Sequence, residues 1–93
     1  MNTLKHLISI DSGRNETTVS IGSLDIYFSY ETPVAFRDNG RLRVSENVWS
    51  TTTGKHLNRI DGGDKQARLP RSEFEAELKG ALVQHGLAHD IQE

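Results

Sequence analysis

Apolar and polar residues alternate along the first half of the chain, with the period of two that half-buried β-strands show. The alternating segments are Leu4–Ile10, Thr17–Ile21, Leu24–Glu31, Val34–Arg37 and Arg41–Glu46. Residues 11–15 are rich in Asp, Ser, Gly and Asn, which predicts a turn after the first segment. Gly22-Ser23 separates the second and third segments, and a two-residue turn with glycine first is typical of a type II′ hairpin. This turn pairs Ile21 with Leu24 and places the apolar residues of both strands on one face.

The third segment is predicted to be a strand with one face in the core. The alternation directs the side chains of Leu24, Ile26, Phe28 and Tyr30 to that face. Thr32-Pro33 follows, and proline has no N–H to donate to a neighbouring strand. We therefore expect a bend or bulge before the fourth strand.

Asp38-Asn39-Gly40 connects the fourth and fifth segments, and two turn lengths are possible. A two-residue Asn-Gly turn would set Phe36 opposite Arg43, which mixes an apolar and a charged residue on one face. A three-residue loop with a left-handed Gly40 sets Phe36 opposite Leu42, and we favour this register. It places Arg37, Arg41 and Arg43 together on the other face as a basic patch, although Asp38 and Glu46 lie close enough to neutralise it.

The pattern becomes helical within Asn47–Ile60, where a short helix is predicted to begin between Ser50 and Thr53. At helical spacing one stripe is assigned to the core, and it contains Trp49, Thr53, Leu57 and Ile60. A second stripe contains Thr52, Lys55, His56 and Arg59. A hydroxyl, an ammonium, an imidazole and a guanidinium near a helix start suit a phosphate or carboxylate. The alternative is a capped surface helix whose polar stripe faces water.

The last third of the chain predicts a loop, an extended segment and a longer helix. The loop is Asp61–Asp64, and in the extended segment 65–70 Leu69 is expected to dock on the sheet. The helix is predicted over residues 72–86, with Ser72 and Glu75 as a capping box and an apolar stripe that packs on the sheet. The predicted fold is α+β within a single domain, residues 1–93. It has an antiparallel sheet of four to five short strands in residues 1–46, a short helix in 47–60, a C-terminal helix packed on the sheet, and a tail, 87–93.

Composition narrows the class of protein. The hydrophobic fraction is only 34% with a mean hydropathy of −0.57, so we expect homo-oligomerisation to add buried surface. The absence of cysteine excludes disulfides and thiolate metal sites. No apolar run is long enough to span a membrane, so we expect a soluble, cytoplasmic protein without membrane contact. The net charge of −2 conceals a basic centre, because residues 37–71 carry eight Lys and Arg against four Asp and Glu. Such a centre permits an anionic partner.

Two stretches resemble a recurring pair of motifs. Residues 29–35 read S-Y-E-T-P-V-A and residues 49–56 read W-S-T-T-T-G-K-H, matching the patterns S-Y-x-T-P-V-A and W-S-x-T-T-x-x-H. These patterns are similar to those of small uncharacterised proteins of bacteriophages and prophages, over about Leu24–Leu57. The resemblance implies a phage-type accessory protein in the host cytoplasm, and counter-defence as a class of role. It implies no activity and no site residue.

The first functional hypothesis is a non-catalytic binder of a phosphate-bearing ligand, such as a nucleotide signal of host immunity. Its predicted site joins the arginines of the hairpin to the helix stripe in one pocket formed by Arg37, Arg41, Arg43, Thr52, Lys55, His56 and Arg59. One alternative is a protein-binding inhibitor of a host defence complex, such as a CRISPR effector. Another is direct binding of nucleic acid by the basic face.

An enzyme is not predicted. The histidines have no recognisable nucleophile or carboxylate dyad around them in sequence. Thr53-Gly54-Lys55 is similar to the end of a phosphate-binding loop, but the upstream glycine is missing. No cofactor is expected. A metal site at His85 and His89 is not expected either, because Gly86 is predicted to break the helix between them and no third ligand is evident.

Overall fold

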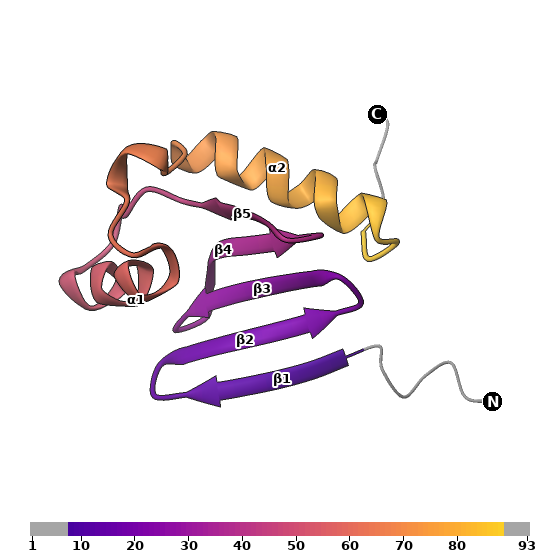
Figure 1. Cartoon of the computed structure of the whole chain (residues 1–93), viewed down its shortest axis with the longest axis horizontal. Coiled ribbons are helices and arrows are strands. Elements are labelled where there is room, and N and C mark those ends of the chain that lie inside the picture. Colours follow the sequence, from indigo (N-terminus) through magenta and orange to yellow (C-terminus); the bar gives the residue numbers. More distant parts are fainter. Residues whose placement is uncertain (1–7, 89–93) are drawn as a thin grey trace.

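A five-stranded antiparallel sheet precedes two helices in the computed structural model, which describes residues 8–88 (Figure 1). The strands lie side by side in chain order: β1 (Ile8–Gly13), β2 (Glu16–Ile21), β3 (Leu24–Ser29), β4 (Thr32–Asp38) and β5 (Arg41–Val44). They are followed by α1 (Thr51–Asp61), the 3₁₀ turn η1 (Lys65–Ala67) and α2 (Arg71–Gln84). The predicted α+β fold is therefore confirmed.

The first hairpin turns later than predicted. Residues 11–13, predicted as a turn, belong to β1, and the chain reverses at Arg14-Asn15 with Gly13 opposite Glu16. Asn15 adopts a φ of +60°, a conformation that Asn tolerates better than most residues. The predicted strand residues 4–7 lie outside the described part of the chain.

The second hairpin has the predicted register. Ile21 lies opposite Leu24 and Val19 opposite Ile26 across a two-residue turn, and Gly22 has a φ of +60°. The hairpin prediction was correct because the turn type and the apolar alternation require the same pairing.

The third turn ends β3 earlier than predicted. Tyr30, predicted to face the core, lies in the turn after Ser29 with a φ of +58° and is 49% exposed. The expected bulge is present, because the β3–β4 register shifts between Tyr27, opposite Ala35, and Phe28, opposite Pro33. Ser29 is buried although the alternation places it on the face opposite Leu24, because Thr53 and His56 of α1 cover that face.

The register predicted for β4 and β5 was wrong. Asn39 and Gly40 form a two-residue turn with φ of +52° and +84°, which sets Phe36 opposite Arg43. Arg43 on this apolar face is accommodated because its guanidinium makes two hydrogen bonds to Glu77 of α2, at 2.7 and 3.0 Å. The same register puts Arg37 opposite Leu42, so the three arginines do not share a face.

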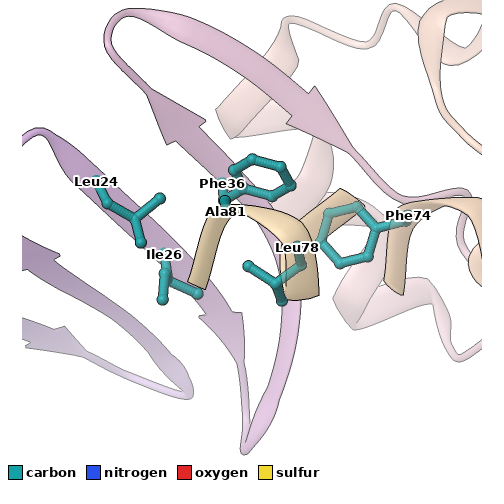
Figure 2. Close-up of a cluster of buried hydrophobic side chains, with 6 residues drawn as sticks. All are labelled: Leu24, Ile26, Phe36, Phe74, Leu78 and Ala81. Atoms are coloured by element: carbon teal, nitrogen blue, oxygen red, sulfur yellow. The ribbon is translucent and has the colours of Figure 1, made fainter. Parts of the chain in front are cut away.

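The two helices cover opposite faces of the sheet. Phe36 belongs to a cluster with Leu24, Ile26 and the α2 residues Phe74, Leu78 and Ala81 (Figure 2). Its neighbour Ala35, which points to the other face, belongs to a second cluster with Val34, Val44 and Leu57 of α1. Because β4 contributes to both clusters, burial on both faces fixes its position.

Both helix starts depend on polar contacts. α1 begins at Thr51 after the N-cap Ser50, within the predicted range. α2 begins at Arg71, and Ser72 does not cap it. The Phe74 N–H donates to the Pro70 carbonyl within the first turn. The Glu75 carboxylate, the predicted partner of Ser72, accepts instead from Arg71 Nε. The capping-box prediction was therefore wrong, because the helix begins earlier.

The segment before α2 lies against the sheet as predicted. Leu69 N–H donates to the Val44 carbonyl and the Glu46 N–H donates to the Leu69 carbonyl, both at 2.8 Å. These bonds form a parallel bridge between Leu69 and Ser45 beside β5. At the other end, α2 stops at Gln84 and Gly86 is left-handed at φ +75°, near the predicted end at residue 86.

Candidate ligand-binding groove

The start of α1 is built by a compact set of side-chain contacts. Ser50 Oγ accepts a hydrogen bond from the Thr53 N–H at 3.2 Å, which caps the helix. The Asn47 amide accepts from the Trp49 N–H and donates to the Ser50 carbonyl, each at 3.0 Å. Gly54 leaves room for this amide, because a Cβ atom there would lie 3.0 Å from Asn47 Nδ2. These contacts connect Asn47, Trp49 and Ser50 to the first turn of α1.

Trp49 lies outside the core, contrary to the prediction. It is 39% exposed, and the Arg71 guanidinium carbon lies 4.8 Å from the centroid of its ring. Arg71 also lies 5.1 Å from the ring centroid of Phe74. The Trp precedes the helix, so the helical stripe that holds Thr53 and Leu57 in the interior does not include it.

A groove of about 480 Å³ lies along the exposed side of α1. We call it the α1 groove; its lining residues are Glu46, Asn47, Thr51, Gly54, Lys55, Asn58, Lys65 and Arg68. Three of these side chains are cationic and one is acidic. The α1 contribution follows the spacing i, i+3, i+4, i+7 from Thr51, so one side of the helix forms one wall.

Arg68 is held rigidly in this wall. Its Nε and Nη2 donate to the Asp61 carboxylate at 2.7 and 3.0 Å, and Nη2 also donates to Asn58 Oδ1 at 3.0 Å. The side chains of Arg68 and Asp61 are only 5% and 6% exposed. Among residues 8–88, Arg68 Nη1 forms no hydrogen bond. It is not fully buried, because every fully buried polar side-chain atom in this range has a partner. Nη1 is therefore the nitrogen left for an outside acceptor.

The protonation state of this pair is well defined. Burial by itself would raise the pKa of Asp61, but hydrogen bonds from Arg68 and from the Gly63 N–H, together with the guanidinium charge, outweigh burial and lower it. The hydrogen bond to Asp61 likewise raises the pKa of Arg68 above its ordinary value, despite burial. Both groups are charged at neutral pH, and the positive charge at the groove is permanent.

The seven predicted ligand residues do not converge on one pocket. Lys55 lines the α1 groove, and Thr52 is exposed on α1 but does not line it. Arg59 pairs with Glu16 of β2. Arg37 donates to Tyr27 Oη at 3.5 Å and to the Gly40 carbonyl at 3.3 Å.

The other two hairpin arginines lie elsewhere. Arg41 and Arg43 line a separate groove of about 670 Å³ beside α2, which Asp38 and Glu77 also line. The expectation of one shared pocket was therefore wrong, since the hairpin has a different register and α1 lies on the face opposite α2.

His56 is buried rather than presented to a ligand. Its Nδ1 lies 2.6 Å from Ser29 Oγ, which in turn lies 3.0 Å from Thr53 Oγ1. Its Nε2 lies 3.6 Å from the Glu16 carboxylate, and the ring centroid lies 6.0 Å from that of Tyr30. Ser29 and His56 are 2% and 4% exposed, so this network joins α1 to the sheet. It also brings together residues of the two motifs, S-Y-x-T-P-V-A and W-S-x-T-T-x-x-H.

Of the residues that line the α1 groove, only Lys55 was predicted from the sequence. Thr51 and Asn58 lie one position away from the predicted stripe, and they were available from the same helical pattern. Lys65 and Arg68 lie beyond the Asp61–Asp64 loop, and no periodicity links them to α1. Their only sequence signal is the basic character of residues 37–71.

Neither a metal-binding cluster nor a membrane-spanning helix is found among residues 8–88. His85 Nε2 lies 2.9 Å from Asp38 Oδ1, while His89 lies beyond residue 88. Within residues 8–88 no three His, Asp or Glu side chains are placed to hold a metal ion. Across the same range, neither helix has the length and apolar character needed to cross a bilayer.

These features define an α+β protein with a small cationic groove beside a helix start. The chain belongs to DUF8033, a family of unknown function, whose model matches residues 4–76. That match includes every residue that lines the α1 groove. No curated protein and no solved structure matches the chain.

Proposed function

We propose that this protein is a non-catalytic binder of a phosphate-bearing ligand, and that the ligand occupies the α1 groove. The observation that carries the proposal is the presence of Lys55, Lys65 and Arg68 in one groove. Glu46 is the one acid among the lining residues, and its carboxylate accepts a hydrogen bond from the Arg71 N–H at 3.1 Å. The lining thus favours an anion, although Asp61 behind Arg68 offsets part of the charge.

The donor types suit phosphate oxygens. A guanidinium fixed by a carboxylate loses little side-chain entropy on binding and offers directional N–H groups. Lys55 and Lys65 supply mobile point charges, and neither forms an ion pair with another residue in the range 8–88. Thr51 and Asn58 add neutral polar groups.

The size of the groove supports a small ligand. Its volume of about 480 Å³ falls within the roughly 300–1,000 Å³ that small-molecule sites occupy. A nucleotide has both the phosphate charge and a suitable size. We assign no reaction to the site, because the hydrogen-bonded pair of Ser29 and His56 is buried and does not line it.

The test is a binding screen with a matched charge control. Isothermal titration calorimetry and thermal shift would be run with linear and cyclic nucleotides, pyrophosphate and phosphate. We expect at least one nucleotide to raise the melting temperature, and Lys65→Glu to weaken its binding about tenfold or more. Lys79→Glu, which reverses an exposed charge on α2 outside the groove, should leave the affinity nearly unchanged.

Two results would contradict the proposal. The first is the absence of any response from the wild-type protein. The second is equal loss of affinity in Lys65→Glu and Lys79→Glu, which would indicate attraction by overall charge. An oligonucleotide that binds more tightly than any mononucleotide, with affinity falling steeply as salt rises, would instead support nucleic-acid binding.

A further inference from the structure

Among residues 8–88, no strand pairs with the outer edge of β1. Within that range β1 pairs only with β2, over six consecutive residue pairs from Ile8–Ile21 to Gly13–Glu16. The opposite edge of the sheet is partly occupied, because Leu69 bonds beside β5. β1 contains no proline, lysine or bulge of the kind that prevents unwanted strand pairing.

The hydrogen-bond phase of the hairpin shows which residues direct their backbone groups outward. Gly13 and Glu16 flank a two-residue turn and therefore form a hydrogen-bonded pair. Counting back from Gly13, every second residue of β1 bonds to β2, and the residues between them direct their N–H and C=O groups away from β2. The bond from the Tyr30 N–H to the Asn15 carbonyl agrees with this alternation, because it shows that Asn15, the residue before Glu16, bonds toward β3. The residues of β1 with outward N–H and C=O groups are therefore Ile8, Ile10 and Ser12.

These three residues form a pattern that is complementary to itself. An antiparallel copy of β1, related by a two-fold axis at Ile10, sets Ile10 opposite its own equivalent and Ser12 opposite position 8 of the partner strand. All the outward groups are then paired. A register centred on Asp11 would pair fewer of them and would oppose two carboxylates, which is unfavourable.

The side chains agree with this register. In it, Asp11 lies opposite position 9 of the partner strand, so the two carboxylates are kept apart. Ile10 is 64% exposed, and the neighbouring β2 residues Val19 and Ile21 on its face are only half-buried. α2 does not cover this part of the sheet, because its cluster reaches only β3 and β4 (Figure 1).

We propose that two copies of this protein associate through β1, in the register centred on Ile10, to form a continuous ten-stranded sheet. The interface is isologous, so each copy contributes the same strand and Ile10 meets its equivalent at the centre. The α1 groove lies outside this interface, because none of its lining residues comes from β1 or β2. Failure of ligand binding and failure of dimerisation are therefore separate outcomes.

Cysteine cross-linking tests the register directly, because the natural chain has no cysteine. In Ile10→Cys the two cysteines would lie directly opposite each other across the interface. Their Cα atoms would be about 5.5 Å apart, which is within the range of disulfides. Ser12→Cys is the matched control on the same face, since its two copies would be separated by four residues, about 13 Å. We expect mild oxidation to give a covalent dimer with Ile10→Cys and little with Ser12→Cys.

Analytical ultracentrifugation of the unmodified protein tests the dimer itself. We expect twice the mass of one chain, a monomer for Ile10→Lys, and an unchanged dimer for Thr18→Lys on the opposite face of the sheet. Circular dichroism would establish that each variant is folded. A wild-type monomer throughout the micromolar to millimolar range would overturn the proposal, and so would equal cross-linking of the two cysteine variants.

Discussion

At the scale of single residues, Asp61 and Arg68 form the most deeply buried ion pair in the described part of the chain, with side chains 6% and 5% exposed. Removing one partner leaves the other charge buried without compensation. Asp61→Asn should therefore lower the free energy of unfolding at pH 7 by about 3 kcal/mol. Urea denaturation would measure the change.

The pH dependence of that difference has a defined sign. The pKa of Asp61 is lower in the folded than in the unfolded protein, so its stabilisation is present above about pH 4 and is lost as pH falls through the folded pKa. The difference in the free energy of unfolding between wild type and Asp61→Asn should become smaller below about pH 4. A gap that stays constant from pH 7 to 3 would show that the carboxylate charge is not its source.

Ser29 provides a second prediction at this scale. Ser29→Ala leaves the buried His56 Nδ1 and Thr53 Oγ1 without the hydroxyl that joins them. We expect a loss of about 1–3 kcal/mol in the free energy of unfolding. Ser12→Ala removes an exposed hydroxyl with one long contact and should change it by less than about 0.5 kcal/mol. Similar losses in both variants would argue against a specific role for the buried network.

At the scale of elements, two helical glycines should respond differently to the same substitution. A Cβ at Gly80 of α2 would meet no atom within 4 Å, whereas one at Gly54 of α1 would lie 3.0 Å from Asn47 Nδ2. Gly80→Ala should stabilise the protein by up to about 1 kcal/mol through helix propensity. Gly54→Ala should gain less stability or lose some, because the added Cβ would displace the Asn47 amide from its hydrogen bonds to Trp49 and Ser50. Thermal melts of the two variants would compare them, and an equal gain would show that the Asn47 contacts contribute little.

The elements also show what the sequence could and could not predict. The β2–β3 hairpin was predictable because Gly22-Ser23 and the apolar alternation independently require one register. The β4–β5 register was not, because Arg43 is accommodated on an apolar face only by Glu77, 34 residues further along the chain. The helix start at Ser50 followed from local capping chemistry. The groove required Lys65 and Arg68 to return beside α1, which no local pattern encodes.

At the scale of the whole molecule, two clusters on opposite faces of one sheet make the fold interdependent. Leu57 of α1 and Phe74 of α2 are both fully buried, and each packs on a different side of β4. Loss of either helix would expose one face of β4 and weaken the support for the other cluster. The protein should therefore unfold in one cooperative step rather than helix by helix.

Leu57→Ala and Phe74→Ala test this coupling from the two faces. Each truncation should lower the free energy of unfolding by roughly 2–5 kcal/mol, a large part of the roughly 5–15 kcal/mol typical of a domain. Trp49 fluorescence reports on the region between the helices, and far-ultraviolet circular dichroism reports on the whole backbone. Within each protein, wild type or variant, the two signals should give one common urea midpoint, and that midpoint should be lower in Leu57→Ala and Phe74→Ala. As a control, Val48→Ala, at a site 54% exposed, should leave the wild-type midpoint nearly unchanged. Separate midpoints for the two signals in Leu57→Ala would mean that α1 detaches while the α2 cluster persists, and would refute the interdependence of the two clusters.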